Sequence, residues 1–141
     1  MLKSITAAII AVSVSADTLP YINFTGTYDD PNHPDCLREI EDNMNGTAKV
    51  YGADAAGGEG AECDGSTDIK WGPLEGTTSW VKDGNSLWHK RIVVDFSPKG
   101  GPSDLTGQWN QDNFRLDWQD GNYWPKHKST VEGKLSMYFR N

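Results

Sequence analysis

Three dipeptides, Asn45-Gly46, Asp83-Gly84 and Asp120-Gly121, constrain the fold of this 141-residue chain more than any other feature of the sequence. Asn-Gly and Asp-Gly tolerate a positive φ angle at both central positions of a type I′ turn, so each predicts a β-hairpin with a two-residue loop. The 3.6-residue spacing of apolar side chains that is typical of amphipathic helices is nearly absent. We therefore expect an antiparallel β-protein.

The segments around these turns have the alternation of short strands. In 88–96, apolar Trp88, Ile92 and Val94 alternate with His89 and Arg91, as in a half-buried strand. Four segments share an apolar residue followed two positions later by glycine, which is expected at a turn, a bulge or a close backbone approach. The expected strands are 37–42 with 47–51, 77–82 with 87–96, and 114–119 with 123–125, and a last strand at 135–139.

Seven or eight short strands at this spacing fit either a small antiparallel β-barrel or a β-sandwich, and we expect the barrel. Residues 54–68 are rich in Gly, Ala and acid and predict a long loop. Residues 97–104, with two prolines and two glycines, predict a second long turn.

The first sixteen residues, 1–16, have the pattern of a secretory signal peptide. Lys3 gives a positive start, an apolar run follows from Ile5 to Val14, and small residues precede Asp17. The run is shorter than the roughly 20 apolar residues of a spanning helix. We expect secretion, or delivery to an organelle lumen, of a single β domain formed by residues 17–141.

The charge of the mature chain argues against nucleic acids and membranes as partners. Without Lys3 it has 12 basic and 20 acidic residues, a net charge of −8. Such a surface repels nucleic acid phosphates and anionic lipids.

Cys36 and Cys63 are the two cysteines, and both follow the predicted cleavage site. An even number of cysteines in a secreted chain predicts a disulfide. The alternative, two metal-binding thiolates, needs further Cys or His ligands at suitable spacing, and the sequence has none. Asn23-Phe-Thr25 and Asn45-Gly-Thr47 are N-glycosylation sequons, which have meaning only in a eukaryotic source.

The aromatic residues around Asp120-Gly121 are either core or binding surface. A two-residue loop pairs Trp118 with Tyr123 and places both on the apolar face of the hairpin. Trp124 then lies among polar residues as a candidate surface ring, unless it covers the open end of the barrel. Trp71 has the same ambiguity.

The other tryptophans are expected in the core. Trp109 lies at the start of a strand, and Trp80 pairs with Trp88 if the loop between them has three residues.

Two polar turns are candidate ligand sites. The run 29–35, DDPNHPD, offers carboxylate and amide oxygens to a cation such as Ca²⁺, but it lacks the EF-hand spacing, and a rigid turn is the favoured interpretation. The run 97–102, SPKGGP, offers backbone N–H groups and Lys99 to an anion, but it is no P-loop, and a connecting turn is again favoured. Arg38 is expected to pair with a carboxylate in the barrel mouth or in the acidic loop, at little gain in stability if the pair is exposed.

Catalytic signatures are weak. The sequence has neither a Gly-x-Ser-x-Gly elbow nor a His-Glu-x-x-His motif, and no motif indicates a cofactor. Carboxylates are numerous, so a pair of them can still meet in space as in a glycosidase.

Phe24-Thr-Gly-Thr-Tyr28 resembles the opening strand of the calycin barrels, the lipocalins and avidins. The resemblance covers only that strand. It implies a barrel with a cavity for a small ligand, and it assigns no ligand residues.

A second resemblance rests on three boxes, the 30–34 run DPNHP, the 95–102 run DFSPKGGP and the 120–124 run DGNYW. These are similar to segments in a group of small, functionally uncharacterised secreted β-proteins of algae and plants. The resemblance implies a photosynthetic eukaryotic source and assigns no function.

The function that these observations favour is a non-enzymatic binding module for a glycan or small molecule, built on an apolar pocket with a few polar groups. Two alternatives remain: a secreted hydrolase with a carboxylate pair, and a structural or interaction protein without a small ligand. The expected ligand-binding residues are aromatic groups that stack and polar groups that orient: Trp124, Trp71, Tyr28, Asp30, Arg38 and Lys99.

Overall fold

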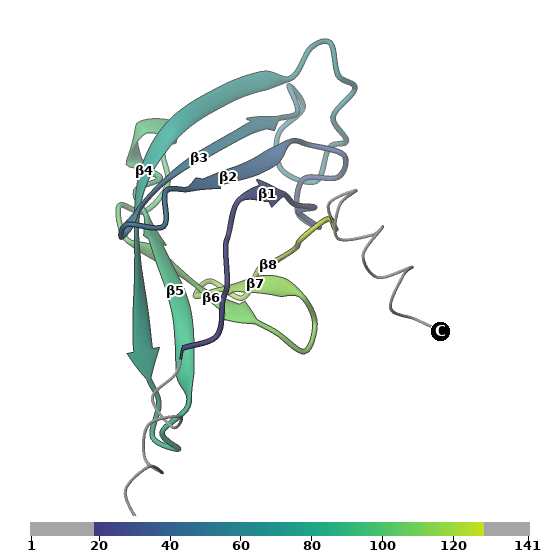
Figure 1. Ribbon diagram of the computed structural model, residues 1–141. Helices are drawn as coiled ribbons and strands as arrows, with labels where there is room; N and C mark the ends of the chain where they lie inside the picture. The colour runs from purple at the N-terminus through teal and green to yellow at the C-terminus, as the bar shows by residue number, and fades with distance from the viewer. Residues whose placement is uncertain (1–18, 129–141) are drawn as a thin grey trace, which may run out of the picture.

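The computed structural model describes residues 19–128, which form one antiparallel sheet of eight strands in chain order (Figure 1). The predicted signal peptide and the predicted strand at 135–139 lie outside the described residues. The strands are β1 (Gly26–Thr27), β2 (Arg38–Asp42), β3 (Thr47–Asp54), β4 (Ile69–Lys82), β5 (Trp88–Val94), β6 (Leu105–Asn110), β7 (Arg115–Trp118) and β8 (Tyr123–Pro125).

The sheet curls so that its two ends approach each other, as a barrel requires. Tyr28, after β1, forms an isolated bridge with Lys126, after β8. Two backbone hydrogen bonds flank this bridge, from Asp29 N to Pro125 O and from His127 N to Thr27 O, both 2.9 Å long. The all-β, barrel-like prediction is therefore confirmed, as one curled sheet with the outline of a half-barrel. The two-sheet sandwich does not form.

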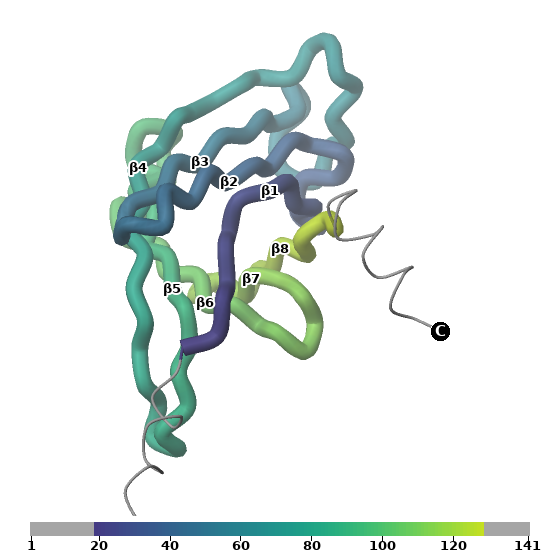
Figure 2. The backbone as a smooth tube through the Cα atoms, in the orientation of Figure 1, coloured from purple at the N-terminus to yellow at the C-terminus, as the bar shows by residue number. Residues whose placement is uncertain are grey.

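The long strand β4 joins the two halves of the curl. Its first part, Ile69–Thr77, pairs with β3, and its second part, Gly76–Lys82, pairs with β5. In Figure 2 the segment before β1 runs past β5 towards the top of the sheet, and Lys90 of β5 donates a hydrogen bond from Nζ to Ile22 O at 2.7 Å. Lys90 also pairs with buried Asp42 at 2.6 Å, which holds this segment against the sheet.

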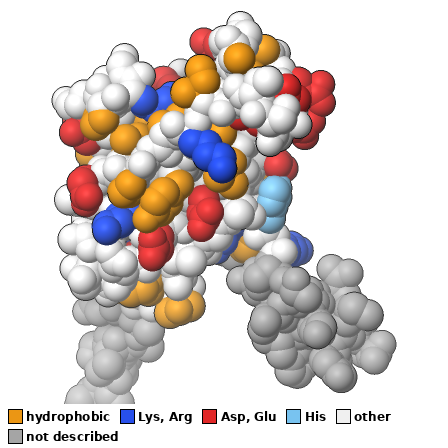
Figure 3. Space-filling view, turned by 90° about the horizontal axis from the view of Figure 1, so that it is seen from above, with side chains coloured by type: hydrophobic (Ala, Val, Ile, Leu, Met, Phe, Trp, Pro, Cys, Tyr) orange, Lys and Arg blue, Asp and Glu red, His pale blue; other side chains and the backbone are white. Residues whose placement is uncertain are grey.

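The alternation of apolar residues explains which face of the sheet is buried. In β2, for example, Arg38, Ile40 and Asp42 point inward and the two glutamates between them point to solvent. The inward-facing side chains meet in one core: Phe24, Tyr28, Ile40, Ala48, Val50, Leu74, Ile92, Val94, Phe96, Trp109, Leu116, Trp118 and Trp124. Figure 3, which views the molecule from above, shows small hydrophobic patches interspersed with charged side chains.

All three predicted hairpin turns exist, but each has a three-residue loop. The pairs that close the loops are Asn43 with Thr47, Asp83 with Leu87 and Trp118 with Asn122. The third loop residue has a positive φ each time, at Gly46 (94°), Ser86 (63°) and Gly121 (94°). In the second and third loops the left-handed residue closes a turn, through the hydrogen bonds from Ser86 N to Asp83 O and from Gly121 N to Trp118 O, both 3.0 Å long, which fits the type I turn with a left-handed residue that is common in three-residue hairpins. The first loop differs, because Met44 also has a positive φ, of 57°.

The extra loop residue corrects the predicted roles of Tyr123 and Trp124. Asp117 pairs with Tyr123 and Leu116 with Trp124, one residue out of the predicted register. A one-residue shift moves every side chain to the opposite face of a strand. Trp124 is therefore buried, with 4% of its surface exposed, whereas Tyr123 is 38% exposed.

The same effect separates Trp80 from Trp88. The predicted pairing of Trp80 with Trp88 required a three-residue loop, and the loop does have three residues. It is centred on Asn85, however, one residue later than that pairing needs. Trp88 therefore pairs with Lys82, and Trp80 pairs with Lys90. Both tryptophans are only half-buried, and the prediction that they form a core pair is wrong. Trp109, in contrast, is buried in the core as predicted.

Two glycines make room for tryptophan rings near the pocket described below. A Cβ atom on Gly107 would lie 2.9 Å from the Trp118 ring, and one on Gly52 would lie 2.2 Å from the Trp71 ring. Both rings thus lie close against the backbone, and at Gly107 this is the close approach expected from the strand glycines.

A disulfide joins Cys36 to Cys63, as predicted, across 27 residues of sequence. Both cysteines are buried, and they tie the 54–68 loop to the turn before β2. Cys63 N also donates to Pro34 O at 2.9 Å, and Gly60 N donates to Asn32 O at 3.0 Å. Among residues 19–128, no helix is long and apolar enough to cross a membrane.

Replacing Cys36 and Cys63 together with alanine is expected to lower the free energy of unfolding by about 3–4 kcal/mol, because the unfolded chain loses the closed loop. Urea unfolding of the oxidised protein and of the variant measures this difference. A reductant should leave the variant unchanged while it destabilises the wild-type protein. A loss below about 1 kcal/mol would contradict the loop-closure explanation.

Candidate binding pocket at the mouth of the curled sheet

A pocket of about 160 Å³ opens where β5 ends and β6 begins. Its walls come from segments spread along the chain: the turn before β2, β2 itself, β4, the 97–102 turn and the β7–β8 hairpin. The aromatic lining consists of Trp71, Phe96, Trp118 and Trp124, and the polar lining of Asp30, His33, Arg38, Lys99, Asp120 and Asn122.

Phe96 is the centre of the aromatic wall. Its ring makes edge-to-face contacts with the rings of Trp71, Trp118 and Trp124, at centroid distances of 6.1, 5.9 and 6.5 Å. Trp118 and Trp124 also meet edge to face at 4.8 Å. Edge-to-face geometry is favourable for aromatic pairs, so the four rings support one another as a rigid wall.

Arg38 lies beneath this wall with only 2% of its surface exposed. Its Nε donates to Asp30 Oδ2 at 2.9 Å, and its Nη1 donates to Ala53 O at 2.6 Å and Leu37 O at 2.8 Å. Its Nη2 lies 2.9 Å from Asp30 Oδ2 and 3.0 Å from Asp54 Oδ1. Four of the five guanidinium N–H groups therefore donate hydrogen bonds within the protein, and Nη2 is also ion-paired with Asp30.

The guanidinium also contacts two rings. Its Cζ lies 5.2 Å from the Trp71 ring centroid and 5.5 Å from that of Trp124. Arg38 was expected to pair in the barrel mouth or with the acidic loop. It pairs with Asp30 in the mouth and with Asp54, the first residue of the acidic 54–68 segment. Because Arg38 is buried, the small contribution of an exposed ion pair does not apply to it.

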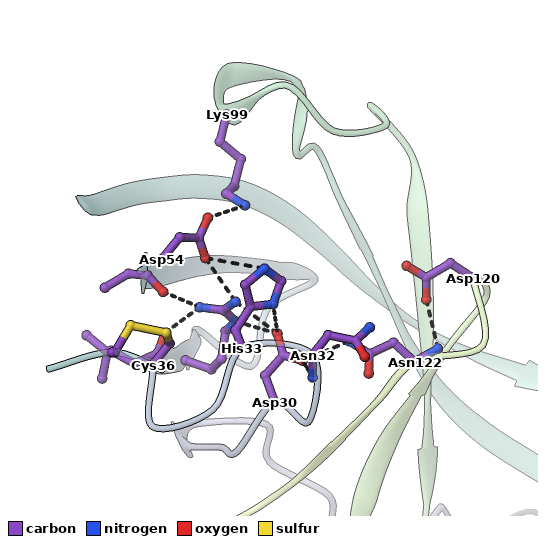
Figure 4. A network of polar contacts seen from close by, with 12 residues as sticks. Asp30, Asn32, His33, Cys36, Asp54, Lys99, Asp120 and Asn122 are labelled. Carbon is purple, nitrogen blue, oxygen red and sulfur yellow. Dashed lines mark hydrogen bonds and ion pairs between the residues drawn. A yellow bond between two sulfur atoms is a disulfide. The ribbon is translucent and has the colours of Figure 1, made fainter. Parts of the chain in front are cut away.

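Asp30 is the buried partner of Arg38. Its carboxylate also accepts hydrogen bonds from Asn32 N at 3.0 Å, from His33 Nδ1 at 2.9 Å and from Asn122 Nδ2 at 3.0 Å (Figure 4). Burial alone would raise the pKa of Asp30. The hydrogen bonds from Asn122, Asn32 and His33 and the charge of Arg38 outweigh burial, so the pKa is lowered.

The 29–35 run is a turn, as favoured from the sequence. His33 N donates to Asp30 O and Cys36 N donates to His33 O, at 2.9 and 3.1 Å. Asp30 points inward, whereas Asp29 points away to His127 at 2.7 Å. Within residues 19–128, no group of three or more His, Cys, Asp or Glu side chains is placed to hold a metal ion.

Lys99 closes the network from above. It projects from the 97–102 turn, a short 3-10 helix (η2, Ser97–Lys99), and its Nζ lies 2.8 Å from Asp54 Oδ2 and 4.9 Å from the Trp71 ring centroid (Figure 4). Burial alone would raise the pKa of Asp54. The hydrogen bond from Lys99 and the charges of Lys99 and Arg38 lower it.

The backbone of this turn is not an anion site. The N–H groups of Lys99 and Gly101 both donate to Phe96 O, and that of Gly100 donates to Ser97 O, at 2.9–3.0 Å. The prediction that residues 97–102 form a connecting turn is therefore confirmed.

Acid is expected to destabilise the protein through Asp30 and Asp54. Their pKa values are lowered in the folded state, so the unfolded chain binds more protons, and the stability they give is present above the unfolded pKa of about 4. The free energy of unfolding should fall as the pH drops through 4 towards the folded pKa values. Urea titrations at pH 7 and pH 3 test this. Asp54→Asn, which cannot take up a proton, should reduce the drop, and an equal drop in the variant would contradict the assignment.

Five of the six predicted ligand-binding residues line this pocket, namely Trp71, Trp124, Asp30, Arg38 and Lys99. Tyr28 does not. It is buried behind Trp124, with its ring centroid 6.3 Å from the Trp124 ring, and its hydroxyl donates to Phe24 O at 2.6 Å. The sequence did not identify Phe96, Trp118, Asp54 or Asn122, because their inclusion depends on strand register and on the curl of the sheet.

A larger groove, of about 780 Å³, lies at the opposite ends of β5 and β6, beside Tyr21 and Trp88. Several of its polar side chains are paired with close neighbours: His89 with Asp83 at 2.6 Å, Lys90 with Asp42 at 2.6 Å and Asp117 with Arg115 at 2.7 Å. The smaller pocket combines four rings with a network of fixed polar groups, and it is the stronger candidate site.

The two sequons lie on turns. Asn45 is exposed, and its Oδ1 accepts hydrogen bonds from Thr47 N at 3.1 Å and Thr47 Oγ1 at 2.6 Å. Asn23 is partly buried, and its Oδ1 accepts from Thr25 N at 2.9 Å. Asn45 is thus the more accessible of the two acceptors.

The comparisons with known proteins add no relative to these observations. No family model, curated protein or solved structure matches the chain.

Proposed function

We propose that this chain is a secreted, non-enzymatic binding module that holds a small ligand in the pocket at the mouth of the sheet. The observation that carries the proposal is the convergence of four aromatic rings and a fixed polar network on one concave site. Small-ligand sites are mostly apolar clefts with a few placed polar groups, and they occur at the mouths of β-barrels.

The size of the pocket limits the ligand. Its volume of about 160 Å³ is well below the roughly 300–1,000 Å³ of sites for drug-sized ligands. The occupant is therefore a small molecule or the terminal residue of a glycan.

The protonation states favour binding over hydrolysis. A carboxylate-pair hydrolase needs one carboxylic acid that keeps its proton near neutral pH, through a raised pKa. Asp30 and Asp54, the two carboxylates joined by Arg38, both have lowered pKa values. Neither is suited to donate a proton to a leaving group.

Secretion is part of the proposal. The N-terminal pattern of residues 1–16 supports it, and the disulfide is compatible with it, because disulfides persist in oxidising compartments. In a eukaryotic source, Asn45 is the expected glycan attachment site, on the evidence of its exposure.

The test is an NMR titration of the ¹⁵N-labelled, oxidised mature protein with sugars and small metabolites, read at the six tryptophan indole N–H signals. Ligand in the pocket should shift the signals of Trp71, Trp118 and Trp124. Trp80 and Trp88 lie away from the pocket lining and serve as internal controls. A thermal-shift measurement gives a second readout, since ligand at 100 times Kd stabilises by about 2.7 kcal/mol.

Shifts confined to the pocket indoles support the proposal. A titration in which none of these signals moves and Tm stays constant would contradict it, and would favour the structural or protein-interaction role.

A further inference from the structure

We infer that the ligand of this pocket is uncharged and rich in hydroxyl groups, the chemistry of a single neutral sugar ring. The inference rests on the proposed function and adds the class of ligand. Three properties of the pocket carry it: the balance of its charges, the hydrogen-bonding groups that remain free, and the shape of its walls.

The cations of the pocket are neutralised inside the protein. Arg38 contacts both Asp30 and Asp54, and Lys99 contacts Asp54. A phosphate or carboxylate ligand would therefore find no unpaired cation, and it would be repelled by Asp120 at the rim. Since the guanidinium is buried and ion-paired with two carboxylates, anion binding would require breaking a buried ion pair.

A cationic ligand is also disfavoured. Aromatic boxes bind cations through the faces of their rings. In this pocket Arg38 already lies over Trp71 and Trp124, and Lys99 lies over Trp71. A second cation would meet these two positive charges at close range.

The polar atoms of the pocket that have no hydrogen-bond partner among the described residues are suited to bind hydroxyl groups. Asp120 Oδ1 accepts a hydrogen bond from Asn122 N at 3.0 Å, while Asp120 Oδ2 has no donor among the described residues. The Asn122 side chain donates to Asp30 and likewise leaves its Oδ1 unused within residues 19–128. A hydroxyl group can donate a hydrogen bond, so ligand hydroxyls can pair with the free oxygens of Asp120 and Asn122.

The walls favour a ring. The edge-to-face cluster around Phe96 gives a rigid apolar surface, against which the C–H face of a sugar can pack. Asp120 and Asn122 belong to the same β7–β8 hairpin and line the pocket, and Figure 4 shows them beside the Asp30 network. The volume of about 160 Å³ suits one ring better than an extended oligosaccharide.

The experiment compares sugars that share a ring and carry a neutral, an anionic or a cationic substituent. Galactose is set against galacturonate, and glucose against glucose 6-phosphate and glucosamine, in the NMR titration above at low ionic strength. The neutral member of at least one series should shift the pocket indoles and bind at least about tenfold tighter than its charged counterparts, a difference of about 1.4 kcal/mol.

Asp120→Asn is the diagnostic variant. Asparagine keeps the oxygen that accepts from Asn122 N and replaces the free carboxylate oxygen with a donor, and the exposed position leaves the core intact. Neutral sugar binding should weaken about tenfold, as for loss of one charge-assisted hydrogen bond. Asp112→Asn, on the exposed β6–β7 turn, is the matched control and should change neither affinity nor Tm.

The outcomes separate the two proposals. If a charged sugar binds as tightly as its neutral counterpart or tighter, with shifts at the pocket indoles, the inference is overturned and the binding function stands. If the neutral sugar binds but Asp120→Asn has no effect, the assigned contact is wrong and the inference falls. If no compound of any charge shifts the pocket indoles or raises Tm, the binding function itself fails.

Discussion

Replacing Arg38 with alanine is expected to lower the free energy of unfolding by about 3–5 kcal/mol, the cost of removing one partner of a buried ion pair. The variant leaves the Asp30 carboxylate, 4% exposed, without its cation. It also removes the donors to Ala53 O and Leu37 O, and the side chain that lies between Trp71 and Trp124. Urea unfolding monitored by tryptophan fluorescence measures the loss.

Arg115→Ala is the control for this prediction. Arg115 pairs with Asp117 at 2.7 Å, but both side chains are partly exposed, so its loss should cost at most about 1 kcal/mol. Arg38→Lys adds a second comparison, because lysine keeps the charge without the planar fork that reaches Asp30 and Asp54 together. If Arg38→Ala cost no more than Arg115→Ala, the buried network would contribute little to stability.

Trp124→Ala is expected to destabilise the protein by about 3–5 kcal/mol, as for other large aromatic side chains removed from a core. The ring is 4% exposed and contacts Tyr28, Phe96 and Trp118. The effect is on folding as well as on the pocket, so Trp124→Ala is unsuitable as a test of ligand binding alone.

Tyr123→Ala is the matched control, because Tyr123 is the next residue and lies on the opposite face, over Arg115 at 4.4 Å. It should cost much less than Trp124→Ala. The reverse order of the two losses would indicate a two-residue loop at Asp120-Gly121 and would place Trp124 at the surface. Equilibrium unfolding of the two variants therefore determines the register of this hairpin.

The sequence predicted the strands better than it predicted their faces. Asn45-Gly46 and Asp120-Gly121 identify hairpins correctly, because few other residues adopt a positive φ. The same dipeptides serve in two-residue and three-residue loops, and the choice between them depends on which side chains the rest of the sheet can bury. At Asp120-Gly121, the longer loop buries Trp124 against Phe96 and exposes Tyr123. The sequence of the hairpin alone does not predict that Phe96 packs against Trp124.

The candidate site was predictable in its residue types and not in its geometry. Trp71, Trp124 and Arg38 stood out as an unusual combination of aromatic and charged groups near turns. That Arg38 would be buried and fully paired depends on Asp54, at the far end of β3, and on Asp30, in the turn before β2. These three residues are adjacent only because β2 and β3 pair with Arg38 opposite Gly52.

The strand order of the sheet has a consequence for how the protein folds. Every strand pairs with its neighbours along the chain, so each hairpin can form locally and the sheet can grow without closing large loops. The pocket is different, since the hydrogen bond from Asn122 to Asp30 joins residues 92 positions apart. We expect the hairpins to form first and the candidate pocket to be completed last, when the two ends of the sheet meet. In stopped-flow refolding, strand formation by circular dichroism should then precede recovery of the native fluorescence of Trp118 and Trp124, so that the pocket exists only in fully folded molecules.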